Sequence, residues 1–205
     1  MTLLRKKNIP IKHYICDASQ YNQLEIIFKE NKIDIVINLA GLQEFPNIPT
    51  LVDYYKMVDC YLNSTFLLLT LMKSYGVNKM ILASSNHVTD YYEKNGYSTL
   101  NREINTNDYP ISNGVYGTLK LAAENLCRSF NINYGIQSIA FRIGTYRDSF
   151  DSENSCDRWN RTRLEKQDLI KYFEKAIENN CTFDVYYLVS DNENKPWDTS
   201  NLIKL

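Results

Sequence analysis

Glycine is scarce in this chain, with 7 residues among 205, and no glycine-rich turn joins one apolar segment to the next. The two glycines that lie closest together, Gly114 and Gly117, flank a tyrosine instead. Glycines allow backbone N–H groups to approach a pyrophosphate closely at the start of a helix. The sequence therefore lacks the usual loop that grips a dinucleotide.

Cysteine pairing is absent as well. The five cysteines are odd in number, lie far apart and form no C-x-x-C pair. This spacing favours neither a zinc site nor a disulfide framework. We expect reduced thiols, no metal centre and a cytoplasmic location.

The chain also has no excess charge of either sign and no long apolar run. Its formal net charge of −1 gives no electrostatic argument for binding nucleic acid or an anionic membrane. No stretch of about 20 apolar residues occurs, and the N-terminus has no apolar segment of the signal-peptide type. We expect neither a membrane span nor a nucleic-acid partner, and a single domain over residues 1–205.

The sequence does contain a regular alternation of apolar segments. Short runs rich in β-branched residues predict strands, and longer segments with apolar residues on one face predict helices. The predicted strands are residues 12–16, 33–39, 79–83, 136–143 and 183–189, and the predicted helices are residues 21–30, 50–74, 113–134 and 167–179. This alternation predicts an α/β fold, with a parallel sheet and helices on both faces.

In such a sheet, ligands bind beyond the carboxyl ends of the strands. Three segments follow predicted strands directly, at residues 40–43, 84–87 and 144–146. We expect these segments to lie near a ligand, whatever it is.

One pair of residues in this sequence has the spacing of an acid/base site. Tyr116 and Lys120 form a Y-x-x-x-K on a predicted helix, so both side chains leave one face. A nearby ammonium favours the phenolate form of a tyrosine, which can then take a hydroxyl proton near neutral pH. About one such pair is expected by chance in this composition. A second pair, Tyr75 and Lys79, does occur, but Gly76 separates it at the end of a helix.

The surroundings of Tyr116 decide between the two pairs. Upstream, a predicted strand ends in Ser84-Ser85-Asn86-His87, and downstream another ends in Arg142-Ile143-Gly144. This layout resembles the extended short-chain dehydrogenase/reductase superfamily, the NAD-dependent epimerase/dehydratase family. Within it, SSNH followed by RIG is similar to the uronate dehydrogenase group. The resemblance covers most of the chain, from residues 16–17 to residues 197–198.

The resemblance implies three catalytic residues. Tyr116 would be the base that removes a proton from the substrate hydroxyl. Lys120 would lower the pKa of Tyr116 and hydrogen-bond the ribose of the nicotinamide, and Ser85 would orient the substrate hydroxyl.

The resemblance also implies NAD as the cofactor and a sugar or sugar acid as the substrate. The residues expected to contact NAD are Asp17, Ala18, Leu39, Ala40, Gly41, Tyr116, Lys120 and Ile143. The residues expected to contact the substrate are Gln43, Asn86, His87 and Arg142. Arg142 would be a bidentate partner of a sugar carboxylate.

Taken singly, several of these residues have simpler explanations. A lone histidine such as His87 is more often a surface or supporting residue than a ligand. Arg142, at a strand end, is as well explained as the partner of a structural ion pair. Ser84 and Ser85 could cap the next turn.

The chain departs from the family in ways that bear on activity. The match begins at the third family strand, near Cys16, so we expect a partial Rossmann-like sheet that lacks the first βαβ unit and its glycine loop. The family's C-terminal tail is also missing, which makes the domain truncated at both ends. Tyr61 stands where the family often has an asparagine, and Arg163 where it has a tryptophan.

The missing strands leave the predicted strand 33–39 without one neighbour. Either residues 12–16 pair with it and close a sheet of about five strands, or its edge stays open and the protein self-associates. We expect the rearranged sheet in the structure and self-association in solution.

Three functions follow from these observations. The first is an NAD-dependent oxidoreductase of the uronate dehydrogenase type, which oxidises C1 of a sugar acid. The second is a nucleotide-sugar epimerase or dehydratase on the same framework. The third is a non-catalytic pseudoenzyme or gene remnant. The absence of the glycine loop favours it, because NAD binding would be impaired without that loop.

Overall fold

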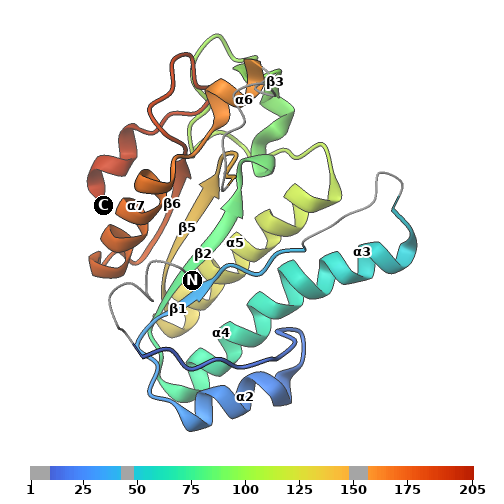
Figure 1. The fold of residues 1–205 in the computed structure, drawn as a ribbon, viewed down its shortest axis with the longest axis vertical. Helices are drawn as coiled ribbons and strands as arrows, with labels where there is room; N and C mark the ends of the chain where they lie inside the picture. Colours follow the sequence, from blue (N-terminus) through green and yellow to red (C-terminus); the bar gives the residue numbers. More distant parts are fainter. Residues whose placement is uncertain (1–9, 43–48, 148–156) are drawn as a thin grey trace.

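The computed structural model describes residues 10–42, 49–147 and 157–205. Its main sheet has four parallel strands in the order β1-β2-β5-β6. The strands are β1 (Val36–Asn38), β2 (Lys79–Ser85), β5 (Gln137–Ile143) and β6 (Phe183–Leu188). In Figure 1 they run side by side, with their carboxyl ends toward the part of the molecule that carries α6 (Asp157–Thr162).

The three longer strands end level with one another. Ser85 of β2 is paired with Ile143 of β5, and Ile143 is paired with Leu188 of β6. The segments that follow these strands therefore meet at one edge of the sheet, as expected for residues 84–87 and 144–146.

Helices α2 (Tyr21–Glu30), α4 (Ser64–Tyr75) and α5 (Val115–Tyr134) cover one face of the sheet. Their apolar side chains form a core with Met80 and Leu82 of β2 and Ala140 of β5. Helix α5 ends at Gly135, which takes a left-handed φ of 71°. The predicted helices 21–30 and 113–134 are confirmed, the second beginning two residues later than expected.

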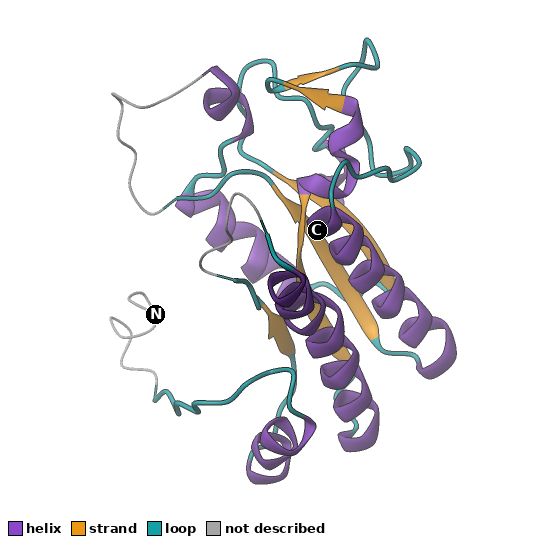
Figure 2. Cartoon of the chain, turned by 90° about the vertical axis from the view of Figure 1, so that its right-hand side faces the viewer, coloured by secondary structure: helices purple, strands orange, loops and turns teal. Residues whose placement is uncertain are grey.

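Helix α7 (Lys166–Glu178) and the short 3-10 helix η4 (Ser200–Lys204) cover the other face. Ile81, Ile139 and Phe141 point to this side, because successive side chains of a strand point to opposite faces. Figure 2 shows the strands enclosed between helices. The predicted α/β fold, with a parallel sheet and helices on both faces, is confirmed.

The predicted helix 50–74 is present but changes its form along its length. It consists of α3 (Leu51–Met57), a π-helical segment η1 (Val58–Asn63) and α4. Thr50 and Asp53 form a capping box at its start, and Gly76, with a φ of 71°, ends it. A π segment inserts an extra residue into a helix and occurs often at functional sites.

Smaller elements lie beyond the carboxyl ends of the strands. They are the 3-10 segment η2 (Asn86–Tyr92), the two-stranded hairpin of β3 (Glu93–Lys94) and β4 (Tyr97–Ser98), and α6. Figure 1 shows them together above the sheet. The polar segment 145–163 thus contains a helix, while its residues 148–156 lie outside the described residues.

The prediction of a strand at residues 12–16 is wrong. This segment has no regular structure, and Ile15 is fully exposed. Its side chains bind the end of α2 instead: Lys12 donates to Asn31, and the hydroxyl of Tyr14 contacts Glu30. The expected sheet of about five strands is therefore wrong as well, because β1 has only β2 as a neighbour among the described residues.

The prediction that residues 33–39 form a strand buried on both faces is also wrong. Only Val36–Asn38 pair with β2. Ile37 is 41% exposed and Leu39 is 62% exposed. Since a buried strand needs cover on both sides, the exposed fractions show that one side of β1 lacks it.

The described residues add two negative observations. No three His, Cys, Asp or Glu side chains among them gather as a metal site requires. Within the same residues, no helix has the length and hydropathy needed to cross a bilayer. Cys16, Cys60, Cys127 and Cys181 are free thiols, and Cys156 lies outside the described residues.

Candidate active site

The first two turns of α5 place Tyr116 and Lys120 at the carboxyl end of β2. Gly114 precedes the helix in an extended conformation, and α5 begins at Val115. Lys120, one turn after Tyr116, is 6% exposed, and its ammonium donates to the carbonyl of Ala83 at 2.7 Å. The Y-x-x-x-K pair is thus anchored directly to β2.

Ser85, the last residue of β2, lies against the tyrosine. Burial raises the pKa of Tyr116, and a hydrogen bond with Ser85 offsets part of that rise. The Ser85 hydroxyl also accepts the backbone N–H of His87 at 3.2 Å. The structure therefore brings Ser85, Tyr116 and Lys120 together at one edge of the sheet.

Burial dominates the electrostatics of the pair. Burial lowers the pKa of Lys120 to about 8, while Cys60 and Glu124 act in the opposite direction. The ammonium lies 6.0 Å from the centre of the Tyr116 ring. The net pKa of Tyr116 is raised, because burial of the phenol is the largest influence on it, and the expected lowering by Lys120 stays a prediction.

Asn86 and His87 continue the site beyond Ser85, the first buried and the second partly exposed. Asn86 is 4% exposed and its side-chain oxygen accepts the Ser85 hydroxyl at 3.3 Å. His87 has a side chain that is 45% exposed, with Nδ1 2.9 Å from the carboxylate of Asp90. Its ring meets the Tyr116 ring edge-on, with centroids 5.6 Å apart. His87 is thus oriented by Asp90 and accessible beside the tyrosine.

The guanidinium of Arg142 is bound to a carboxylate of the protein itself. The side chain is 4% exposed, and its guanidinium binds both carboxylate oxygens of Glu124, at 3.1 and 2.9 Å. A third bond reaches the hydroxyl of Tyr187 at 3.3 Å, and Ser84 donates to the same carboxylate. Glu124 occupies the side of the guanidinium that would face a sugar carboxylate, so the bidentate contact with a substrate finds no support here and stays a prediction. The alternative, a structural ion pair, is confirmed.

The second Y-x-x-x-K pair does not form a site. Lys79 begins β2 at the opposite end of the strand from Ser85. Its ammonium donates to the carbonyls of Ile177 and Asn179 at the end of α7, where a cation also interacts favourably with the helix dipole. Tyr75 packs instead against Phe28.

Comparison with known proteins agrees with this geometry. The sequence model of the NAD dependent epimerase/dehydratase family matches residues 3–148. The chain belongs to this family.

Two similar proteins differ in how much of their own length this chain covers. The chain is 36% identical over 205 residues to uncharacterized protein YtbQ of Bacillus subtilis, covering 99% of this chain and 81% of that protein. It is 23% identical to a uronate dehydrogenase of Pseudomonas syringae, covering 93% of this chain and 63% of that enzyme. The chain thus spans less than two thirds of the uronate dehydrogenase.

A solved structure supports the fold. The uronate dehydrogenase of Agrobacterium tumefaciens superposes with a TM-score of 0.76 at 20% identity, over 96% of this chain and 70% of that one. At this identity the likeness concerns the fold.

The segments expected to contact the family's dinucleotide lie near the site. The amide of Asn38 donates to Thr65, and its oxygen accepts the N–H of Ala40, which shapes the segment of Leu39, Ala40 and Gly41 after β1. Asp17 is exposed and accepts both the N–H and the hydroxyl of Ser19. These two contacts hold the pKa of Asp17 below its usual range.

The remaining expected residues are placed as follows. Ala18 is half-buried beside the core under α4, and Ile143 ends β5 level with Ser85. Gln43 lies outside the described residues.

A cavity of about 520 Å³ opens beside the tyrosine. It is lined by Leu42, Tyr54, Met57, Tyr61, Gly114, Val115 and Tyr116. Leu42 belongs to the segment 40–43 that was expected near a ligand, and Tyr116 is a predicted catalytic residue. The sequence did not single out Tyr54, Met57 or Val115 as contacts.

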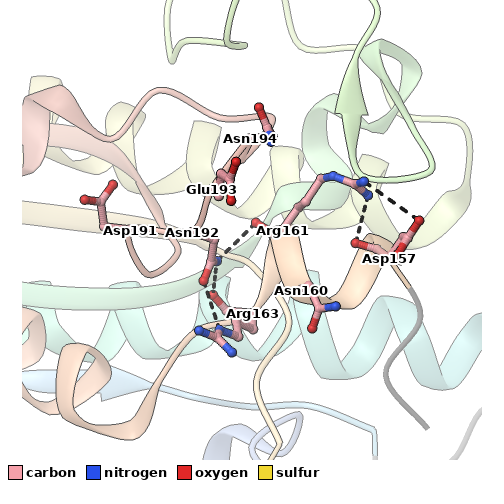
Figure 3. Close-up of a pocket in the computed structure, with 8 residues that line it drawn as sticks. All are labelled: Asp157, Asn160, Arg161, Arg163, Asp191, Asn192, Glu193 and Asn194. Carbon is pink, nitrogen blue, oxygen red and sulfur yellow. Dashed lines mark hydrogen bonds and ion pairs between the residues drawn. The ribbon is translucent and has the colours of Figure 1, made fainter. Parts of the chain in front are cut away.

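Figure 3 shows a second cavity, of about 370 Å³, which is polar and lies beside α6. Asn192 connects its walls, because its amide donates to the carbonyls of Arg161 and Arg163 and its oxygen accepts Nε of Arg163 at 3.0 Å. Asp157 lies 4.0 Å from Arg161, one turn away on α6, and both line the cavity. None of the predicted site residues lines this cavity.

Proposed function

We propose that the chain is an NAD-dependent oxidoreductase of the uronate dehydrogenase type, acting on the C1 hydroxyl of a sugar acid. The observation that carries the proposal is the assembly of Ser85, Tyr116 and Lys120 at the carboxyl end of β2, next to Asn86 and His87. When bound, NAD supplies the acceptor for the hydride that leaves the sugar carbon.

Each residue has a task that fits its position. Tyr116 takes the proton of the substrate hydroxyl, and Ser85 holds that hydroxyl against the phenol. Lys120 has a pKa that burial lowers to about 8, so its charge changes in the mildly alkaline range, one helical turn from the phenol. His87, exposed and held by Asp90, contacts the sugar from the solvent side.

The residues present fit one end of the cofactor and not the other. Tyr116, Lys120 and the shaped segment Leu39–Gly41 suit the nicotinamide and its ribose. The sequence has no glycine-rich turn to donate backbone N–H groups to the pyrophosphate. We therefore expect NAD to bind weakly and to be held mainly at the nicotinamide end.

The choice of a sugar acid as substrate rests on Ser85, Asn86 and His87. Arg142 does not support this choice, because its guanidinium is bound to Glu124. The test is to incubate the purified chain with excess NAD and either galacturonate or glucuronate, and to follow NADH absorbance. Glucose and galactose, which lack the carboxylate, are the matched control substrates. NADH formed from the uronates and not from these sugars is the expected result.

Incubating the same purified chain with UDP-glucose or UDP-galactose separates the alternatives. Interconversion of UDP-glucose and UDP-galactose, with no net NADH, would replace this proposal with a nucleotide-sugar epimerase. No conversion of any of these substrates at saturating NAD would leave the non-catalytic alternative.

We also propose that the chain self-associates through β1, with a second copy as the partner. Among the described residues β1 is paired on one side alone, and Ile37 and Leu39 expose apolar surface there. An unpaired, apolar edge is a template for pairing with another strand.

A further inference from the structure

We propose that Tyr61 is a positioning residue of this site, which holds the ammonium of Lys120 and the ring of Tyr116 in place. The inference rests on the proposed function, since it assigns how the acid/base pair is held. It concerns a position where the chain departs from its family.

Tyr61 contacts both members of the pair. Its ring centre lies 4.6 Å from the ammonium of Lys120, within the range of a cation–π contact. The same ring meets the ring of Tyr116 at a centroid distance of 5.1 Å and an angle of 71°. This edge-to-face geometry is favourable between aromatic rings. The aromatic side chain of Tyr61 therefore separates the ammonium from the cavity side of the site.

The hydroxyl of Tyr61 provides a third contact. It accepts the backbone N–H of Leu42 at 3.2 Å. Leu42 follows Gly41 in the segment after β1, where the family's dinucleotide passes. One side chain thus links that segment to both residues of the acid/base pair.

The helix is deformed where Tyr61 leaves it. Tyr61 lies within the π segment Val58–Asn63, and two hydroxyl groups donate to carbonyls of this segment. Ser64 donates to the carbonyl of Cys60 at 2.5 Å, and Thr65 donates to that of Tyr61 at 2.8 Å. Thr65 also accepts the amide of Asn38 from the end of β1. Side chains from α4 and the end of β1 thus bond to one another beside the π segment, and Tyr61 itself is 8% exposed.

The contact between the Tyr61 ring and the ammonium should be measurable as a change in the pKa of Lys120. The groups that face the ammonium are Cys60 from η1, Glu124 from α5 and the carbonyl of Ala83 from β2, besides the rings of Tyr61 and Tyr116. The Tyr61 ring favours the charged form in a site where burial disfavours it. Removing the ring while keeping the volume apolar should therefore make Lys120 easier to deprotonate.

The test measures the pKa of Lys120 in the whole chain, without cofactor or turnover. Lysine carrying ¹³C at Cε is titrated by NMR, and the Lys120 signal is assigned with Lys120→Arg. In Tyr61→Leu the pKa should fall by roughly 0.5 to 1 relative to the unchanged chain, the scale of a partly buried cation–π contact. Tyr61→Met, which is unbranched and fills the space differently, serves if the leucine variant does not fold.

Two controls separate positioning from general packing. Tyr61→Phe keeps the ring, so the pKa of Lys120 should stay unchanged while hydrogen exchange at the Leu42 amide becomes faster. Lys79, whose pKa burial also lowers, lies at the other end of β2 and should titrate alike in all variants. An unchanged or raised Lys120 pKa in Tyr61→Leu and Tyr61→Met would overturn the proposal. Absence of dehydrogenase activity would remove the proposed function and leave this measurement intact.

Discussion

Gly117 packs directly against the backbone of His87, so closely that a Cβ on Gly117 would lie 2.6 Å from the carbonyl carbon of His87. The helix that carries Tyr116 and the segment that carries Asn86 and His87 therefore approach as near as two backbones can. A methyl group here would also meet the hydroxyl of Ser112, but moving that side chain would leave the His87 backbone in the way.

We predict that Gly117→Ala separates these two segments and destabilises the chain. Forcing extra volume into a close contact costs about 1–3 kcal/mol, which lowers the melting temperature by roughly 2–12 °C in a chain of this size. Thermal unfolding followed by circular dichroism measures it. Gly114→Ala is the control, since nothing lies within 4 Å of a Cβ there. Equal melting temperatures for the two variants would contradict the packing described.

Much of this fold was predictable from the sequence. The apolar periodicity located α2, α5 and α7, because each helix buries a continuous face against a sheet. The runs that became β2, β5 and β6 are apolar on both sides, as strands between two layers must be. The carboxyl-end rule predicted that residues 84–87 lie near a ligand, and the family resemblance implied that Ser85 acts together with Tyr116 and Lys120.

Other features depend on contacts that a local pattern does not contain. Residues 12–16 alternate like a strand, but a strand also needs a partner edge, and side-chain bonds to α2 hold the segment elsewhere. Arg142 has its partner Glu124 18 residues away on another element, so its role depended on three-dimensional pairing. The π segment around Tyr61 was not predicted either, because the periodicity of residues 50–74 indicated one continuous helix.

Lys120 should make stability depend on pH in a specific window. Burial lowers its pKa in the folded chain from 10.5 to about 8. Between these two values the unfolded chain holds the proton and the folded chain does not, so the free energy of unfolding rises with pH across this window. The rise from Lys120 should be on the order of 3 kcal/mol.

Urea unfolding at pH values from about 7 to 10.5 measures this effect. The difference between the unchanged chain and Lys120→Met isolates the contribution of Lys120, because the tyrosines and cysteines titrate in both proteins. Lys166→Met, at an exposed position, is the matched control and should keep the full rise. A rise of the same size in Lys120→Met would show that other groups cause it.

NAD binding should be weak, because no glycine-rich turn places backbone N–H groups and a helix dipole at the pyrophosphate. Calorimetric titration of the purified chain should give a dissociation constant well above the low micromolar range. Nicotinamide mononucleotide, which lacks the pyrophosphate and adenosine, is the matched ligand and should bind nearly as well as NAD. A low micromolar constant for NAD alone would show that the chain grips the phosphates by other groups.

Self-association should depend on the free edge of β1. Ile37→Lys places a charge on that strand, which disfavours pairing with a second copy. Light scattering over a range of concentrations should show assemblies for the unchanged chain and fewer for the variant. Ile203→Lys, on η4 and 87% exposed, is the control and should behave like the unchanged chain. A monomer at every concentration would contradict the prediction.

The measurement that tests the central claim most directly is NADH formation from a uronate by the chain and by two tyrosine variants. Tyr116→Phe keeps the ring but removes the hydroxyl that takes the proton, so the rate should fall roughly 100-fold or more. Tyr75→Phe makes the same change in the second Y-x-x-x-K pair and should leave the rate within about twofold, because Lys79 there is bound to the end of α7. An equal rate in Tyr116→Phe and the unchanged chain, or no NADH from the unchanged chain at saturating NAD, would contradict the account.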